Sequence, residues 1–211
     1  SMAPIVIYPN TLDYGTVTEQ PGYDPIAADT KLNAMCCDRI HVVYGDFDAD
    51  EMNKTSNKQP YKKYRITYFA RALSKGGDKY YGLYRSKESW IQPLNVLDPA
   101  ATFGKWTFDC RPDDCYDGEL VREYLTDMSF TAIGKYGEII KADPVSNAES
   151  IYDIRSVDVS LTFRSSAKKG FFRNLAADDK PRIIRSLGRE AVELFDKFLR
   201  DTIFVTVHTR N

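Results

Sequence analysis

Hydrophobic and polar residues alternate along several stretches of the chain, most regularly over residues 154–164 (IRSVDVSLTFR). There Val157, Val159 and Leu161 occupy one side of an extended chain, and polar residues occupy the other. A period of two is typical of a strand with one buried and one wetted face, the usual condition in an antiparallel sheet. Similar stretches predict further strands at residues 39–44, 64–73, 79–85, 105–108, 120–124, 128–133, 138–141 and 203–209.

Short turns join several of these predicted strands. Gly76-Gly77 lies between the stretches 64–73 and 79–85, and a Gly-Gly pair between two alternating runs is a strong hairpin signal. Residues 135–137 (KYG) form a second tight turn before the last strand of that region. Because turns and not crossover helices make these connections, the strands are expected to form antiparallel meanders.

The period changes between residues 181 and 199, where apolar residues recur three or four positions apart. Pro181 stands near the start, a position that the first turn of a helix tolerates. The pattern predicts an amphipathic helix at about 181–199. The fold class expected is therefore α+β, mainly antiparallel β, with meander sheets and one helix in the C-terminal region. The apolar face of that helix would consist of Ile184, Leu187, Ala191, Leu194, Phe195 and Phe198.

One globular domain is expected over residues 1–211, because a chain of this length buries roughly 70% of its unfolded surface in a single core. Residues 1–38 form a loop-rich segment with Pro-Gly and Asp-Pro pairs, and residues 39–211 form the β-rich body. The Ser1-Met2 start is typical of a cloning remnant on an excised fragment, and it lacks the charged and apolar regions of a signal peptide.

Charge is balanced, since 29 Lys and Arg against 30 Asp and Glu give a formal net charge of −1. A nucleic-acid-binding domain would show a basic stripe or an excess of positive charge, so nucleic acid is not an expected partner. The apolar run Ile5–Tyr8 is four residues long, far shorter than the roughly 18 residues of a membrane-spanning helix. The residues present here are therefore expected to be soluble.

No catalytic site is predicted. The two histidines, His41 and His208, lie within alternating strand patterns, which favours a structural or surface role over nucleophilic catalysis. The sequence contains no nucleophile elbow, phosphate-binding loop or dinucleotide-binding motif. The protein is therefore expected not to be an enzyme.

Two groups of acidic residues are candidate ligands for a weak calcium site. The first resembles the start of a calcium-binding loop, but it lacks the glycine after Asp50 and has Asn57 at the twelfth position. The second surrounds two cysteines and fits a solvated loop equally well. No other cofactor is expected. The groups are Asp46, Asp48 and Asp50, and Asp109, Asp113, Asp114 and Asp117.

Four cysteines stand as Cys36-Cys37 and as Cys110 and Cys115. Adjacent cysteines and the wide spacing of the second pair suit a tetrahedral zinc site poorly, so disulfides in an oxidising compartment are the favoured interpretation. Four cysteines allow three connectivities, and the sequence leaves all three open. Reduced, buried thiols are the remaining alternative.

Five segments follow one another in order: 38–44 (DRIHVVY), 66–68 (ITY) leading into 82–85 (GLYR), 120–139, 157–165 (VDVSLTFRS) and 199–211 (LRDTIFVTVHTRN). In this order they resemble the J-type minor pseudopilins of type II secretion and the W-type minor pilins of type IV pili. Each segment alone is a simple strand signature. Their order over residues 38–211 and the Arg210-Asn211 ending carry the resemblance.

The resemblance implies a pilin-like head and a structural, non-catalytic function in the tip complex that primes a type IV pilus or a type II secretion pseudopilus. Its partners would be other minor pilins or pseudopilins. Members begin with a long hydrophobic helix that anchors them in the inner membrane, with the head in the periplasm or at the tip of an extracellular pilus. Without that helix, one sheet face is expected to expose an apolar area. Residues 109–117 would correspond to a variable loop that carries a disulfide or calcium in pilins.

A secreted carbohydrate- or host-binding β domain is the alternative, based on the tyrosines of the predicted hairpin at 64–85 and on the acidic loops. Aromatic residues are equally expected in a half-buried sheet, because they favour strands. A calcium-assisted hydrolase, which would need paired carboxylates in a cleft, is a third interpretation.

Overall fold

The computed structural model describes residues 4–9, 24–25, 37–47, 61–91, 104–108, 118–142, 151–166, 182–184, 191–194 and 198–209. Each secondary-structure element within these residues is a β-strand, and each pairing between strands is antiparallel. No helix in this part of the chain has the length and apolar character needed to cross a membrane.

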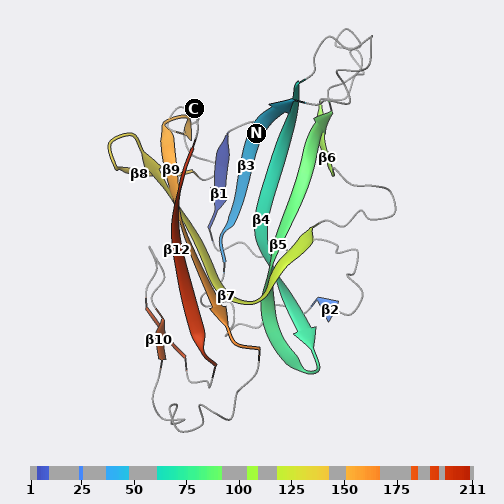
Figure 1. Cartoon of the computed structure of the whole chain (residues 1–211), viewed down its shortest axis with the longest axis vertical. Coiled ribbons are helices and arrows are strands. Elements are labelled where there is room, and N and C mark those ends of the chain that lie inside the picture. Colours follow the sequence, from blue (N-terminus) through green and yellow to red (C-terminus); the bar gives the residue numbers. More distant parts are fainter. Residues whose placement is uncertain are drawn as a thin grey trace.

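The described strands are β1 (Ile5–Tyr8), β2 (Asp24–Pro25), β3 (Arg39–Phe47), β4 (Tyr61–Lys75), β5 (Asp78–Ile91), β6 (Lys105–Phe108), β7 (Glu119–Gly134), β8 (Ile139–Ile140), β9 (Ile154–Arg164), β10 (Arg182–Ile184), β11 (Val192–Leu194) and β12 (Arg200–His208). One sheet of 10 strands has the order β1-β3-β4-β5-β7-β9-β12 along its main path (Figure 1). Within it β2 pairs with β4, β6 with β5, and β8 with β7, while β10 and β11 pair with each other as a separate small sheet.

The predicted α+β class is wrong, because the described part of the chain is almost entirely antiparallel β and holds no amphipathic helix. Within the predicted helix at about 181–199 the structure has β10 and β11, with Ile184 opposite Val192. β-Branched residues favour strands, and Gly188 between the two strands is a poor helix former. Apolar residues three or four positions apart also arise from two short strands joined by a polar connection, so the spacing was not decisive.

The hairpin predicted around Gly76 and Gly77 is confirmed. Strands β4 and β5 pair along their length, with Lys75 opposite Asp78 across the turn. Both glycines have a positive φ, 58° and 81°. A two-residue turn of this kind matches the twist of the flanking strands, and glycine adopts it at both positions without steric cost.

Strand β7 is continuous, although the sequence pattern predicted two strands at 120–124 and 128–133. Register shifts interrupt its pairing with β5 at two places and its pairing with β9 between Leu125 and Asp127. At each of these shifts β7 carries an extra residue, which bends the strand and increases its twist. Tyr124 at one of the shifts has a φ of 63°, a left-handed conformation that costs a non-glycine residue roughly 1–2 kcal/mol.

The bends in β7 divide the sheet into two halves (Figure 1). Strand β7 pairs with β5 through residues 119–125 and with β9 through residues 125–134. One half therefore comprises β1, β3, β4 and β5, and the other comprises the second part of β7 with β9 and β12. A buried cluster spans both halves and contains Ala70, Tyr81, Leu83, Leu125, Met128 and Phe163.

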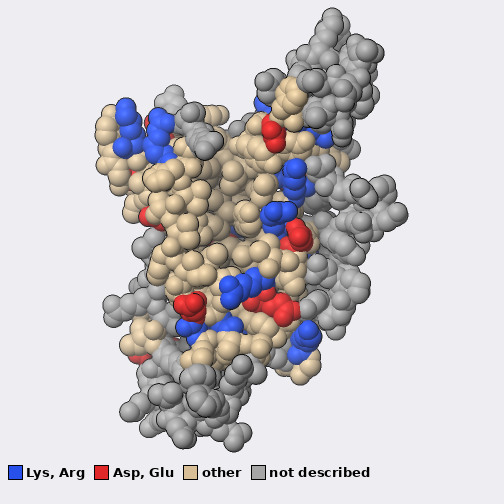
Figure 2. Space-filling view, viewed as in Figure 1, with Lys and Arg blue, Asp and Glu red and all other residues tan. Residues whose placement is uncertain are grey.

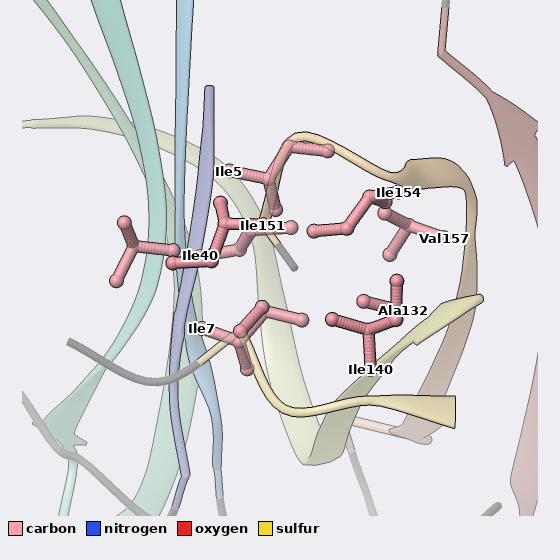
Figure 3. Close-up of a cluster of buried hydrophobic side chains, with 10 residues drawn as sticks. Ile5, Ile7, Ile40, Ala132, Ile140, Ile151, Ile154 and Val157 are labelled. Carbon is pink, nitrogen blue, oxygen red and sulfur yellow. The ribbon is translucent and has the colours of Figure 1, made fainter. Parts of the chain in front are cut away.

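Backbone hydrogen bonds also join the two halves. The N–H of Asp38, just before β3, donates to the carbonyl of Met128 at 2.8 Å, and its carboxylate accepts the N–H of Phe130 at 3.0 Å. The N–H of Ile7 in β1 donates at 2.7 Å to the carbonyl of Ala142, which follows β8. A second buried cluster lies here, where side chains of β1 and β3 meet those of β7, β8 and β9 (Figure 3).

We predict that Asp38→Ala lowers the free energy of unfolding by about 1–3 kcal/mol, because the N–H of Phe130 loses its acceptor in a nearly buried place. Asp38 itself is 7% exposed. Asp46→Ala is the control: this carboxylate is exposed and accepts the N–H of its neighbour Phe47, so its removal should change stability by less than about 0.5 kcal/mol. Urea unfolding measures both variants, and equal losses would contradict the role given to Asp38.

Candidate functional site

An apolar groove of about 630 Å³ lies between the two halves of the sheet. Strands β3, β4 and β5 contribute one wall, and β7, β9 and β12 contribute the other. Side chains of both walls turn toward the same space. They include Val42, Tyr44, Tyr68 and Leu83 on the first wall, and Phe130, Val159, Leu161 and Val207 on the second.

Strand alternation and register place these side chains in rows. On the second wall Phe130 lies opposite Val159, and Val159 lies opposite Val205 of the last strand. On the first wall Ile40 lies opposite Tyr68. Because directly opposed residues share one face of a sheet, each wall presents a continuous apolar surface to the groove.

The groove has a buried floor and an exposed rim. Ile5 and Ile154 on the floor are 5% and 3% exposed and belong to the cluster drawn in Figure 3. Val207 and Tyr152 on the rim are 51% and 60% exposed. A contiguous apolar surface that stays accessible to this degree is typical of an interaction site.

No Asp, Glu, Lys or Arg is among the described residues that line the groove. Figure 2 shows a broad area without charged side chains over β9 and β12. Charged groups gather toward the upper left, the right side and the lower end of this face. In the part of the chain that the structure describes, no group of three or more His, Cys, Asp or Glu could hold a metal ion. The groove is therefore suited to binding an apolar partner by burial of hydrocarbon surface, worth about 25 cal/mol per Å².

Of the predicted disulfide candidates, Cys37 is a described residue, and it is fully buried and disulfide-bonded. Its side chain packs in the cluster that contains Tyr81 and Met128. Cys36, Cys110 and Cys115 lie outside the described residues, so all three connectivities stay open. The disulfide of Cys37 is fixed in the core directly beside Asp38, the residue that joins the two halves.

Of the predicted calcium ligands, Asp46 is a described residue. It is exposed near the end of β3, and its Oδ1 accepts the N–H of Phe47 at 2.8 Å. The calcium site stays a prediction, because the other candidates lie outside the described residues. Those candidates are Asp48, Asp50, Asp109, Asp113, Asp114 and Asp117.

Three tyrosines of β5 are core residues, whereas Tyr68 of β4 is half-buried and lines the groove. Tyr80, Tyr81 and Tyr84 are 0%, 1% and 2% exposed. The ring of Tyr80 stacks on that of Tyr124 with 4.3 Å between the centroids. A ring this deeply buried cannot present a face to a sugar, so these three tyrosines give no support to the carbohydrate-binding interpretation.

His41 lies on the face of β3 opposite the groove, with its ring 4.8 Å from that of Tyr8. Burial, reinforced by the positive charges of Arg65 and Arg39, lowers the pKa of His41 from 6.5 to about 3. Arg65 is held in place by Glu88, with distances of 2.6 Å from Nε to Oε2 and 2.7 Å from Nη2 to Oε1. His41 is therefore uncharged at neutral pH. His208, by contrast, lines the groove and is exposed.

The sequence did not reveal which residues form the groove. The resemblance predicted an apolar area on one sheet face, and the alternating stretch at 154–164 supplies Val157, Val159 and Leu161 to it. Val42 and Tyr68 on the facing wall come from strands far earlier in the chain. No local pattern indicates that two such faces confront each other, because that arrangement depends on the bends in β7.

We predict that His41 makes the protein less stable as the pH falls from 6.5 to about 3. In that range the unfolded chain binds a proton at the imidazole that the folded chain does not bind, so protonation favours unfolding. His41→Gln removes this contribution while keeping a neutral, polar side chain. Urea unfolding at several pH values should show the wild type losing stability relative to His41→Gln as the pH falls. A constant difference between the two would contradict the lowered pKa.

No protein-family model, no curated protein sequence and no solved structure matches this chain. Its function must therefore be inferred from its own residues. The apolar groove, with its accessible hydrocarbon lining, is the feature on which we base that inference.

Proposed function

We propose that this chain is the globular head of a minor pilin or pseudopilin, a non-catalytic structural subunit in the tip complex that primes a type IV pilus or a type II secretion pseudopilus. The observation that carries the proposal is the apolar groove between the two halves of the sheet. Its occupant in this proposal is a hydrophobic helix of the same protein, of the kind with which members of the resembled family begin.

The size of the groove supports a helix as the occupant. One helical turn, about 10 Å across and 5.4 Å long, fills roughly 400 Å³. The groove volume of about 630 Å³ therefore exceeds the volume of one complete helical turn. The groove can hold the inward-facing side chains of a longer helix. Laying the apolar side of a helix into a groove is a recurrent mode of protein association.

The chemistry of the lining supports an apolar helix in particular. Val42, Phe130 and Val159 are half-buried, and they would complete their burial against such a helix. A charged or strongly polar occupant would find no charged partner among the described lining residues and would lose its own hydration. Hydrophobic contact is thus the interaction that this surface offers.

The segments behind the family resemblance also support the proposal. They correspond to β3, the β4–β5 hairpin, β7, β9 and β12, the strands that form the two walls of the groove. Pro4 and Ile5 line the groove as well, so a helix that precedes these two residues would end next to the groove. That helix would anchor the subunit in the inner membrane, with its head in the periplasm or at the pilus tip and other minor pilins or pseudopilins as its neighbours.

The two other interpretations have less support. Of the hairpin tyrosines that suggested carbohydrate binding, Tyr64, Tyr80, Tyr81 and Tyr84 are buried, and Tyr68 is half-buried. A hydrolase needs a pair of carboxylates in a cleft, and none is among the described residues that line the groove. An acyl chain would fit the same apolar surface, and the test must distinguish it from a helix.

We predict that Val159→Lys abolishes function in the cell. Deleting the gene from its native organism should remove surface pili or type II secretion, and the wild-type gene should restore the activity. Val159→Lys should fail to restore it, because the ammonium group would stand in the path of the apolar helix. The variant should still fold, since Val159 is half-buried and a lysine there can extend its charge into water.

Tyr136→Lys is the matched control, because Tyr136 is 85% exposed and does not line the groove. It should restore activity fully, and immunoblotting should show both variants at wild-type levels. Full activity of Val159→Lys would contradict the proposal. A deletion strain that keeps both pili and secretion would also contradict it, as would native mass spectrometry that finds a stoichiometric fatty acid bound to the purified chain.

A further inference from the structure

Strand β12 is the last strand on the main path of the sheet (Figure 1). Among the described residues it pairs with β9 alone, in an unbroken register from Arg200 to His208. The other end of the path is different, because β1 is buried and the N–H of Ile7 donates to the carbonyl of Ala142. Within the described part of the chain, the protein itself closes one edge of the sheet, and no strand pairs with the outer edge of β12.

Alternate residues of β12 turn their backbone N–H and C=O groups toward the open edge. The hydrogen bonds at the two ends of the pairing show which residues of β12 point their backbone groups toward β9. The N–H of Ser165 donates to the carbonyl of Leu199, and the N–H of Thr209 donates to the carbonyl of Arg155. In an antiparallel pair every second residue makes such bonds. The odd-numbered residues of β12 therefore bond to β9, and Thr202, Phe204 and Thr206 face outward.

Strand β12 has accessible apolar side chains on both faces. Ile203, Val205 and Val207 continue the groove wall and are 40%, 49% and 51% exposed. Phe204 on the other face is 57% exposed. Residues 202–207 contain no charge and no proline, and no bulge interrupts the strand. Natural proteins usually place charges, prolines or bulges on an exposed edge strand to prevent its association with another strand.

We propose that β12 pairs antiparallel with β12 of a second copy of this chain, so that the sheet continues across a two-fold axis. Phe204 lies opposite Phe204 of the second copy, Thr202 opposite Thr206, and Ile203 opposite Val205. This proposal does not depend on the function proposed above, because it uses the strand edge and not the groove.

Register and chemistry agree in this arrangement. A two-fold axis perpendicular to the sheet keeps each face on its own side, so outward-facing residues meet outward-facing residues and their N–H and C=O groups exchange hydrogen bonds. Ile203 and Val205 meet on the groove face, and Thr202 and Thr206 meet on the other. Within residues 202–206 no like charges oppose each other, which would be destabilising in a directly opposed pair.

A second copy meets the requirements that this edge imposes on an added strand. The added strand must be extended, uncharged and apolar at alternate positions, and residues 202–207 of β12 have that composition. It is also held in shape by its own chain: Thr206 Oγ1 donates to Asp158 Oδ1 at 2.7 Å, and the hydroxyl oxygens of Thr202 and Thr162 are 2.9 Å apart. A strand ordered in advance loses less conformational entropy when it pairs.

Analytical ultracentrifugation of the whole chain from about 1 µM to about 500 µM tests the proposal. The wild type should form a dimer within this range. Phe204→Lys places two ammonium groups opposite each other and should weaken association at least tenfold. Phe204→Pro removes an outward-facing N–H, which β9 does not use, and should also abolish the dimer. Tyr136→Lys, which adds the same charge at a distant exposed site, should dimerise like the wild type.

A charge exchange tests the two-fold register. Phe204→Lys and Phe204→Glu should each be monomeric alone, and their mixture should form a heterodimer, because position 204 faces itself. Circular dichroism must show the wild-type fold for each variant. A wild type that stays monomeric at the highest concentration would overturn the proposal, as would a mixture that fails to associate or a dimer unaffected by Phe204→Pro. Val159→Lys in the groove should leave the dimer intact, which separates this test from that of the proposed function.

Discussion

The bend of β7 is the constraint on which the rest of the structure depends. Three extra residues in this one strand let it pair with β5 at its start and with β9 at its end, in two different directions. Tyr124 takes up a left-handed conformation at one of these points, and its ring stacks on Tyr80. An aromatic stack of this kind contributes about 0.5–1.5 kcal/mol, comparable to the cost of the strained backbone. With a straight β7, the two apolar faces would lie side by side and no groove would exist.

Hydrogen bonds also join the two halves that the bend creates. Asp38 ties the start of β3 to Met128 and Phe130 in β7, and Ile7 ties β1 to Ala142. The neighbouring Cys37 holds a disulfide within the buried cluster that spans both halves. These ties hold the two halves of the sheet together beside the groove. The groove is thus preformed, and an occupant need not reorganise the sheet to enter it.

The sequence was informative about strands and misleading about one segment. Alternation at 154–164 identified β9 and its apolar face, and Gly76-Gly77 identified the hairpin, because both signals are local. The segment at 181–199 was assigned to a helix, since its apolar spacing does not show that two short strands can pair there. The bend of β7 had no local signal either, because its left-handed residue is a tyrosine where glycine would be expected. The groove could not be predicted without that bend.

The groove and the open edge of β12 use different groups of the same wall. Val159 and Leu161 offer side chains to an occupant of the groove, whereas Thr202, Phe204 and Thr206 offer backbone N–H and C=O groups to another strand. Val207 belongs to both surfaces, since it lines the groove and lies on the edge strand. Because one surface binds by burial and the other by hydrogen bonding along a perpendicular direction, both can be occupied together. A helix in the groove would contact the side chain of Val207, whereas a second strand would pair with the backbone groups of Thr206 and Phe204, so the two occupants would use different groups.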